Sequence, residues 1–211
     1  MSLNHRFTIW RQSSSVSRRH LNRIVLIPAA LLLAGCASAP RSINNVCAVF
    51  EQQDGWVRNW ERSAKVAERR HGIPVAILMA TIRKESGFKS NAKPPRRQLL
   101  GFIPWKRQSS AYGFAQALDG TWEEYKRERG GFGANRSNFD DSVDFVGWYH
   151  GKTVQRFGIA PTDAFNLYLA YYSGWAGYAK GSWQSDPGLQ RTARDTAEMA
   201  RSYDAQLREC R

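Results

Sequence analysis

Residues 74–88 read PVAILMATIRKESGF, and this apolar stretch, which closes on charged residues, decides the fold. Pro74 is favourable in the first turn of a helix. Because the stretch shows no period-two alternation, it predicts a core helix that begins at Pro74 and runs to about Ser86. Gly72, just before it, is expected to end a preceding helix.

Glu85 is notable within this helix because it continues the apolar face. It follows Leu78 by seven residues and Ile82 by three, so at about 100° per residue the three side chains share one side. Arg83 and Lys84 are expected on the solvated side. Desolvation on the core side raises a carboxyl pKa, which suits a general acid near neutral pH. The helix alone leaves a second interpretation open, in which Glu85 reaches solvent or pairs with Arg83 or Lys84.

The rest of the chain also favours helices over strands, because period-two alternation is scarce. Helices are expected over about 55–70, 119–129, 140–157, 161–173 and 187–208. Two segments are expected to be loops: a basic, proline-containing one at 87–110 and a glycine- and aromatic-rich one at 173–185. The pattern predicts an all-α domain of six to eight helices.

The N-terminus has the layout of a bacterial export signal. Arginines without any acidic residue precede an apolar run at 24–33, which is shorter than the roughly 20 residues of a spanning helix. The run is followed by Ala34-Gly35-Cys36, and the whole resembles a lipobox, in which the cysteine is lipidated and becomes the mature N-terminus. An uncleaved anchor helix with a chance cysteine is the alternative.

These features divide the chain into three parts. We expect a signal peptide over 1–35, a lipidated tether over 36–43 and a single domain over 44–211. By the same resemblance, Ala37 after the lipidated Cys36 implies an outer-membrane lipoprotein on the periplasmic face.

The chain is strongly basic, with a formal net charge of +13. A basic balance favours nucleic acid, an anionic membrane or an acidic polymer as partner. Export argues against nucleic acid, whereas the stem-peptide carboxylates of peptidoglycan would be attracted to a basic surface. A generally soluble basic surface explains the charge equally well.

Two cysteines follow Cys36. In an oxidising compartment the pair Cys47 and Cys210 is expected to form a disulfide. Helical periodicity supports this, because Cys47 shares a face with Val46 and Phe50, and Cys210 lies on the apolar stripe of the C-terminal helix. Two buried free thiols are the alternative.

Three short blocks occur in series along the chain. They read Glu85-Ser86-Gly87-Phe88, Ala111-Tyr112-Gly113-Phe114-Ala115-Gln116 and Ala170-Tyr171-Tyr172-Ser173-Gly174. In order and approximate spacing they resemble the signature blocks of soluble-lytic-transglycosylase (SLT) domains, which share the goose-type lysozyme fold. Over roughly 60–180, the resemblance implies a lysozyme-like helical domain with a substrate cleft.

The resemblance also implies roles for single residues. Glu85 matches the family's catalytic acid/base, and Ser86 matches the serine beside it. Gly113 and Gln116 match the second block, whose glutamine binds substrate. In the third block, Tyr171 matches the tyrosine whose hydroxyl approaches the carboxylate, and Gly174 matches the closing glycine. Aromatic residues at Tyr112, Tyr171, Tyr172 and Trp175 are further candidates for lining the cleft, whereas Phe114 is expected in the core.

The sequence departs from the family pattern at two places. Phe114 and Ala115 replace a Leu-Met pair, and Tyr172 stands where the family usually has asparagine. The small Ala115 and the bulky Tyr172 therefore imply a remodelled substrate-binding wall.

The chemistry that the resemblance implies is cleavage of the bond between N-acetylmuramic acid and N-acetylglucosamine, with a 1,6-anhydro product and one carboxylate, Glu85, as acid and then base. A hydrolytic muramidase and a non-catalytic peptidoglycan-binding lipoprotein are the two alternatives. His71 and His150 are isolated, and no zinc-binding run occurs, so no metal or cofactor is expected. We expect a monomer that binds glycan strands.

Overall fold

The computed structural model describes residues 39–53, 59–99, 103–107, 109–129 and 133–210, with the backbone alone over 97–107. These residues belong to one compact unit, Ser38–Arg211. The predicted signal peptide and lipidation site, 1–35 and Cys36, lie outside them. Within the described ranges, no helix has the length and apolar character needed to cross a membrane.

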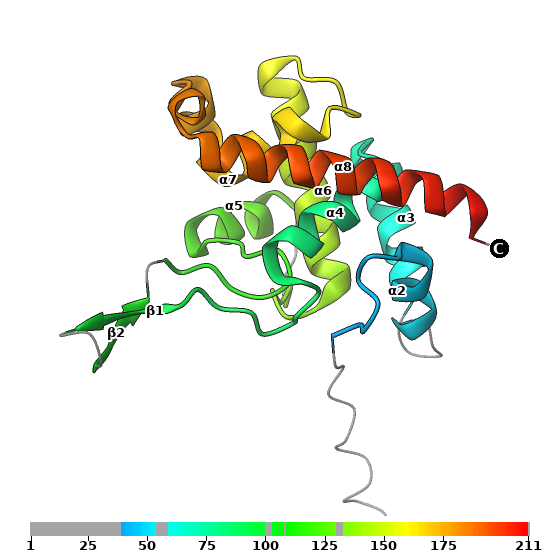
Figure 1. Cartoon of the computed structure of the whole chain (residues 1–211), viewed down its shortest axis with the longest axis horizontal. Helices are drawn as coiled ribbons and strands as arrows, with labels where there is room; N and C mark the ends of the chain where they lie inside the picture. The colour runs from blue at the N-terminus through cyan, green and yellow to red at the C-terminus, as the bar shows by residue number, and fades with distance from the viewer. Residues whose placement is uncertain (1–38, 54–58, 100–102, 108, 130–132, 211) are drawn as a thin grey trace, which may run out of the picture. The chain divides into compact units, whose positions relative to one another are not determined.

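Seven α-helices make up most of the described chain, which confirms the all-α prediction. In chain order the elements are α2 (Val46–Gln53), α3 (Trp60–His71), α4 (Val75–Ser86), β1 (Arg96–Leu99), β2 (Ile103–Arg107), α5 (Asp119–Arg129), α6 (Phe139–Phe157), α7 (Ala164–Ala179), the short 3-10 helix η2 (Ser182–Ser185) and α8 (Pro187–Glu209). Figure 1 shows α8 lying across α4 and α7, with α6 on the other side of α4.

Helix α4 is the centre of the domain, because α3, α6 and α8 all pack against it. Leu78, Met79 and Ile82 are fully buried, as their apolar pattern predicts. Lys84 is exposed as expected, and Arg83 is half-buried. The Arg83 guanidinium lies 5.8 Å from the ring centroid of Tyr203 on α8, so its stem covers apolar surface between the two helices.

The helices begin and end where capping chemistry allows. The side chain of Asn59 accepts a hydrogen bond of 2.6 Å from the backbone of Arg62 at the start of α3, which then ends at Gly72 as predicted. Asp186 caps α8 in the same way, through the backbone N–H of Leu189 at 2.8 Å. Each cap satisfies an N–H group that the helix itself leaves unpaired.

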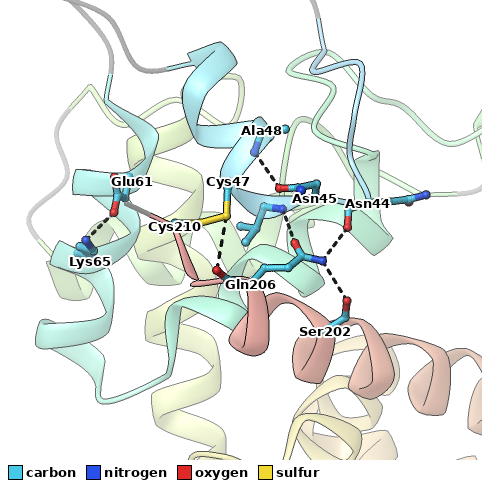
Figure 2. Close-up of a disulfide and its surroundings, with 10 residues drawn as sticks. Asn44, Asn45, Cys47, Ala48, Glu61, Lys65, Ser202, Gln206 and Cys210 are labelled. Carbon is cyan, nitrogen blue, oxygen red and sulfur yellow. Dashed lines mark hydrogen bonds and ion pairs between the residues drawn. A yellow bond between two sulfur atoms is a disulfide. The ribbon is translucent and has the colours of Figure 1, made fainter. Parts of the chain in front are cut away.

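A disulfide joins the two ends of the domain. Cys47 on α2 and Cys210 after α8 are bonded, with their Cα atoms 5.7 Å apart. Gln206 supports the junction, because its side-chain oxygen accepts from the Val46 N–H at 2.8 Å and its amide donates to the Asn44 carbonyl at 3.2 Å (Figure 2). The pairing predicted from the helical faces is therefore present in the structure.

The structure corrects both predicted loops. Segment 87–110 contains the antiparallel strands β1 and β2, paired Arg96 to Arg107 and Leu99 to Ile103, and they extend from the helices in Figure 1. Hairpins of a few residues are difficult to detect in a sequence with so little alternation. Segment 173–185 is largely helical, because α7 continues to Ala179 and η2 follows.

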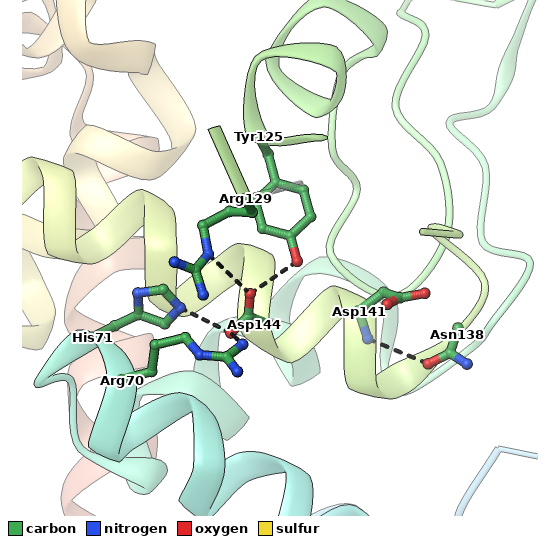
Figure 3. A network of polar contacts seen from close by, with 7 residues as sticks. All are labelled: Arg70, His71, Tyr125, Arg129, Asn138, Asp141 and Asp144. Atoms are coloured by element: carbon green, nitrogen blue, oxygen red, sulfur yellow. Dashed lines mark hydrogen bonds and ion pairs between the residues drawn. The ribbon is translucent and has the colours of Figure 1, made fainter. Parts of the chain in front are cut away.

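An ionic network fixes α3, α5 and α6 to one another. The carboxylate of Asp144 on α6 accepts hydrogen bonds from Arg70 at 2.7 Å, from His71 at 2.9 Å and from Tyr125 at 2.9 Å (Figure 3). Arg129 lies 3.7 Å from the same carboxylate. Burial alone would raise the pKa of Asp144, but the hydrogen bonds outweigh it and hold that pKa well below its ordinary range.

Candidate active site

Glu85 lies in the last turn of α4, at the edge of the core. Its side chain is partly buried, two positions from the C-terminal Gly87. Burial raises the pKa of the Glu85 carboxyl from its ordinary 4.5 to about 7, opposed by a hydrogen bond from Tyr168 and by the charge of Lys84. At neutral pH this carboxyl exchanges a proton readily, which is the property of a general acid/base.

The tyrosine that touches this carboxylate is Tyr168, which sequence reasoning missed. Its hydroxyl donates to Glu85 Oε1 at 2.9 Å, from the middle of α7. Tyr171, which the family resemblance assigns to that position, donates instead to the carbonyl of Ala115 at 2.6 Å. A helical clue was available, because Tyr168 lies one turn before the candidate Tyr172 and on the same side of the helix.

A tight turn anchors Glu85 after α4 ends. Phe88 adopts a positive φ of 62° and is almost fully buried, a conformation that costs a non-glycine residue about 1 kcal/mol or more. Its ring packs at 6.0 Å against Trp60, which also contacts Phe114 at 5.4 Å and stacks on Phe139 at 4.0 Å. This cluster joins the first and second sequence blocks, and it places Phe114 in the core as expected.

The second block is a turn for which its glycine is required. Gly113 has φ 78°, and a Cβ at this position would lie 1.9 Å from the Arg136 carbonyl oxygen. The N–H of Gly113 donates to the Ala92 carbonyl at 3.0 Å, and that of Phe114 donates to the Arg136 carbonyl at 3.1 Å. The turn is therefore clamped between two distant segments.

The Gln116 side chain stabilises the same turn. Its side-chain amide nitrogen donates to the carbonyls of Ala92 at 3.0 Å and Gly113 at 2.8 Å. The neighbouring Ala115 is fully buried and accepts the Tyr171 hydroxyl, so the block touches α7 through its backbone. The small Ala115 thereby gives Tyr171 room to reach a main-chain carbonyl.

The third block bends α7. Gly174 has φ 69° and ψ 158°, which interrupts the helix and lets it resume in a new direction. Tyr172 is 63% exposed, so its ring is accessible to a ligand. Trp175, in contrast, packs flat on Tyr149 at 4.4 Å and donates from Nε1 to Thr153 at 2.9 Å. The contacts of Trp175 are therefore with α6, and its indole N–H is already paired.

Thr81 and His150 form a buried polar pair next to Tyr171. His150 is fully buried, and burial lowers its pKa to about 3, so its ring is neutral. The Thr81 hydroxyl donates to the Ile77 carbonyl at 2.9 Å, so it accepts from His150 Nε2 at 3.1 Å. The His150 ring lies 5.3 Å from that of Tyr171, which links α4, α6 and α7 behind Glu85.

The Ser86 hydroxyl makes its hydrogen bond within its own helix. Ser86 is buried, and its hydroxyl donates to the Ile82 carbonyl at 3.1 Å within its own helix. Among the described residues, no group of three or more histidine, cysteine, aspartate or glutamate side chains is arranged to hold a metal ion. His71 is engaged by Asp144 at 2.9 Å.

The sequence of this chain matches a family model. A family model described as "Transglycosylase SLT domain" matches residues 24–210. A search of curated proteins found no match. The match implies a transglycosylase-like function with peptidoglycan as substrate. Because it spans most of the chain, this protein belongs to the transglycosylase SLT domain family.

Proposed function

We propose that this protein is a lytic transglycosylase that cleaves the β-1,4 bond between N-acetylmuramic acid and N-acetylglucosamine, with Glu85 as the single acid/base. The observation that carries the proposal is the environment of Glu85. Its carboxyl combines partial burial, a hydrogen bond from Tyr168 and a pKa of about 7, so both protonation states are accessible at neutral pH.

In the proposed reaction the Glu85 carboxyl first donates one proton and then regains one. Protonated Glu85 gives its proton to the glycosidic oxygen, the C1–O4 bond breaks, and N-acetylglucosamine leaves with a free 4-hydroxyl. The neighbouring N-acetyl group stabilises the cation at C1. Ionised Glu85 then takes the proton of the C6 hydroxyl, whose oxygen bonds to C1 and closes the 1,6-anhydro ring. The internal nucleophile needs no bound water, which favours ring closure entropically.

Tyr168 has a defined part in this cycle. Its hydroxyl donates to the ionised form of Glu85 and so stabilises the carboxylate between the two proton transfers. Burial, followed by the charge of Glu85, raises the pKa of Tyr168 above its ordinary value, so the phenol stays a donor at neutral pH. Tyr168 therefore orients one oxygen of Glu85 and leaves the other for the substrate.

The proposed anhydro product needs one carboxylate, whereas hydrolysis commonly uses two. Most hydrolytic glycosidases place a second carboxylate within about 5–9.5 Å of the acid. The Glu85 side chain accepts its hydrogen bond from the Tyr168 hydroxyl at 2.9 Å. Asp144, the most strongly held carboxylate, is committed to Arg70 and His71.

The test is Glu85→Gln on purified peptidoglycan. We expect this variant to bind sacculi like the wild type and to release no muropeptides, whereas Glu198→Gln, which changes an exposed carboxylate on α8, keeps full activity. Mass spectrometry of wild-type products distinguishes the chemistry, because a hydrolytic product is one water heavier than an anhydro end. Equal release by wild type and Glu85→Gln would instead support the non-catalytic peptidoglycan-binding alternative.

The same proposal includes a location. A lipidated Cys36, followed by a tether to residue 43 and a domain over 44–211, would hold the enzyme on the periplasmic face of the outer membrane. The Cys47–Cys210 disulfide suits an oxidising compartment. Labelled palmitate should enter the wild-type protein and not Cys36→Ser, and membrane fractionation should then show Cys36→Ser released into the soluble fraction.

A further inference from the structure

A pocket lies beside the second sequence block, and its lining residues take no part in the proposed proton transfers. It has a volume of about 310 Å³ and is lined by Lys93, Ser109, Ser110, Ala111 and Tyr112. The Lys93 ammonium lies 5.2 Å from the ring centroid of Tyr112, and the Arg136 guanidinium lies 5.5 Å from it. Two cations therefore lie within cation–π distance of the Tyr112 ring.

Only one of these two cations is neutralised by a carboxylate among the described residues. Arg136 pairs with Asp119 at 2.8 Å and donates to the Ala117 carbonyl at 2.8 Å. Lys93 is exposed, and no described carboxylate lies within ion-pair distance of its ammonium. Its three hydrogen-bond donors are thus available to a ligand.

Two serine side chains, Ser109 and Ser110, also line the pocket. Ser109 Oγ accepts from the Ala111 N–H at 3.3 Å, and Ser110 Oγ accepts from the Asp119 N–H at 3.1 Å. A serine hydroxyl can donate its own hydrogen while its oxygen accepts a backbone hydrogen, so each can also donate to a ligand. An ammonium with two hydroxyl donors is the chemistry that binds a carboxylate.

The pocket adjoins the second sequence block, which contacts α7 through Tyr171. Tyr112 and Ala115 are three residues apart, so their Cα atoms lie no more than about 11 Å from each other. The Ala115 carbonyl accepts the Tyr171 hydroxyl, and Tyr171 in turn feels the charge of Glu85. An extended tripeptide spans about 10 Å, so a stem peptide extends the substrate well beyond the sugar that carries the reacting bond.

We propose that this pocket binds a carboxylate of the stem peptide through Lys93 and the Ser109 and Ser110 hydroxyls, and so makes the enzyme prefer peptide-bearing glycan. This inference rests on the proposed function and deepens it, because it names the part of the substrate recognised away from the reacting bond. Recognition of the substrate away from the reacting bond affects substrate binding and leaves the chemistry at Glu85 unchanged.

The experiment compares Lys93→Gln with wild type in the full chain on two substrates. The first is peptide-bearing glycan strands, and the second is strands stripped of stems by an amidase, whose only carboxylates are lactyl groups. We expect Lys93→Gln to lower kcat/KM on peptide-bearing strands about three- to ten-fold, chiefly through KM. Its kcat/KM on stripped strands should equal that of wild type, and Lys93→Arg should restore most of the loss.

Lys180→Gln is the matched control, since it removes one exposed lysine charge at the end of α7. It should behave as wild type on both substrates. Unchanged kinetics of Lys93→Gln on peptide-bearing strands, or an equal loss on both substrates, overturns the proposal. A loss confined to stripped strands overturns it too, because the carboxylate bound would then be the lactyl group.

A binding measurement separates this proposal from the failure of the proposed function. Free stem tetrapeptide is titrated into wild type and Lys93→Gln, and binding is followed by amide shifts in NMR spectra. We expect shifts at Lys93, Ser110 and Tyr112 in wild type, with at least three-fold weaker binding to Lys93→Gln. If the protein cleaves no glycan, this result still stands; if equal binding is found, the pocket assignment is wrong.

Discussion

The hydroxyl of Tyr168 donates a hydrogen bond of 2.9 Å to Glu85 Oε1, across 83 residues of sequence. Burial raises the pKa of Glu85 to about 7, and this hydrogen bond is the largest influence in the opposite direction. The contact therefore sets how acidic the carboxyl is when it meets the glycosidic oxygen.

Replacing Tyr168 by phenylalanine should shift the pH dependence of cleavage. The hydrogen bond favours the ionised form of Glu85, so its loss raises the pKa of Glu85 further. The protonated acid then persists to higher pH, and we expect the alkaline limb of the kcat/KM profile to move about one pH unit upward. The rate at neutral pH should fall because the carboxyl is less well oriented.

Tyr178→Phe is the control for that experiment. Tyr178 lies on the same helix, but its hydroxyl donates to Asn166 at 2.9 Å and does not touch Glu85. Its pH profile should match that of wild type. An unshifted alkaline limb in Tyr168→Phe would show that the contact does not control the acidity of Glu85.

Glu85→Gln should stabilise the protein at alkaline pH. The folded pKa of about 7 exceeds the ordinary 4.5, so between these values the folded state holds a proton that the unfolded state has lost. Wild-type stability therefore falls as pH rises through this window, by up to about 3 kcal/mol. Glutamine does not titrate. Denaturant unfolding should give equal stabilities for the two proteins at pH 4 and a more stable Glu85→Gln at pH 8.

Gly113→Ala should damage both stability and activity. The added Cβ would meet the Arg136 carbonyl oxygen at 1.9 Å, and the positive φ is unfavourable for alanine. We expect a loss of about 2–4 kcal/mol in the free energy of unfolding. Gly120→Ala, in α5 with no atom within 4 Å of the added carbon, should be neutral or slightly stabilising. Similar unfolding curves for the two variants would contradict this reading of the second block.

Asp144→Asn should destabilise the fold without changing the pH profile of catalysis. It leaves Arg70 and His71 without their shared carboxylate, at a cost of about 3 kcal/mol at pH 7. Because the pKa of Asp144 is depressed in the folded state, its contribution is present above the ordinary value of 3.8 and is lost as pH falls below it. The stability gap between wild type and Asp144→Asn, measured by urea unfolding, should therefore narrow in acid. Asp195→Asn, at an exposed position on α8, provides the comparison.

The sequence by itself determined the helical class, the central helix and the position of Glu85 on its core face. This was possible because the spacing of residues within 74–88 itself shows which side chains share a helical face. Gly72 and Pro74 mark the limits of the neighbouring helices, because each has a backbone preference of its own. The pairing of Cys47 with Cys210 was also predictable, since each cysteine lies on an apolar helical face.

Only the tertiary structure decided which side chains meet. Tyr168, and not Tyr171, reaches Glu85, because the rotation of α7 against α4 is set by packing that no local pattern encodes. Gly113 is required because the distant Arg136 carbonyl occupies the space a side chain would need. The β1–β2 hairpin and the continuation of α7 past Gly174 were missed for the same reason: contacts beyond the local window stabilise them.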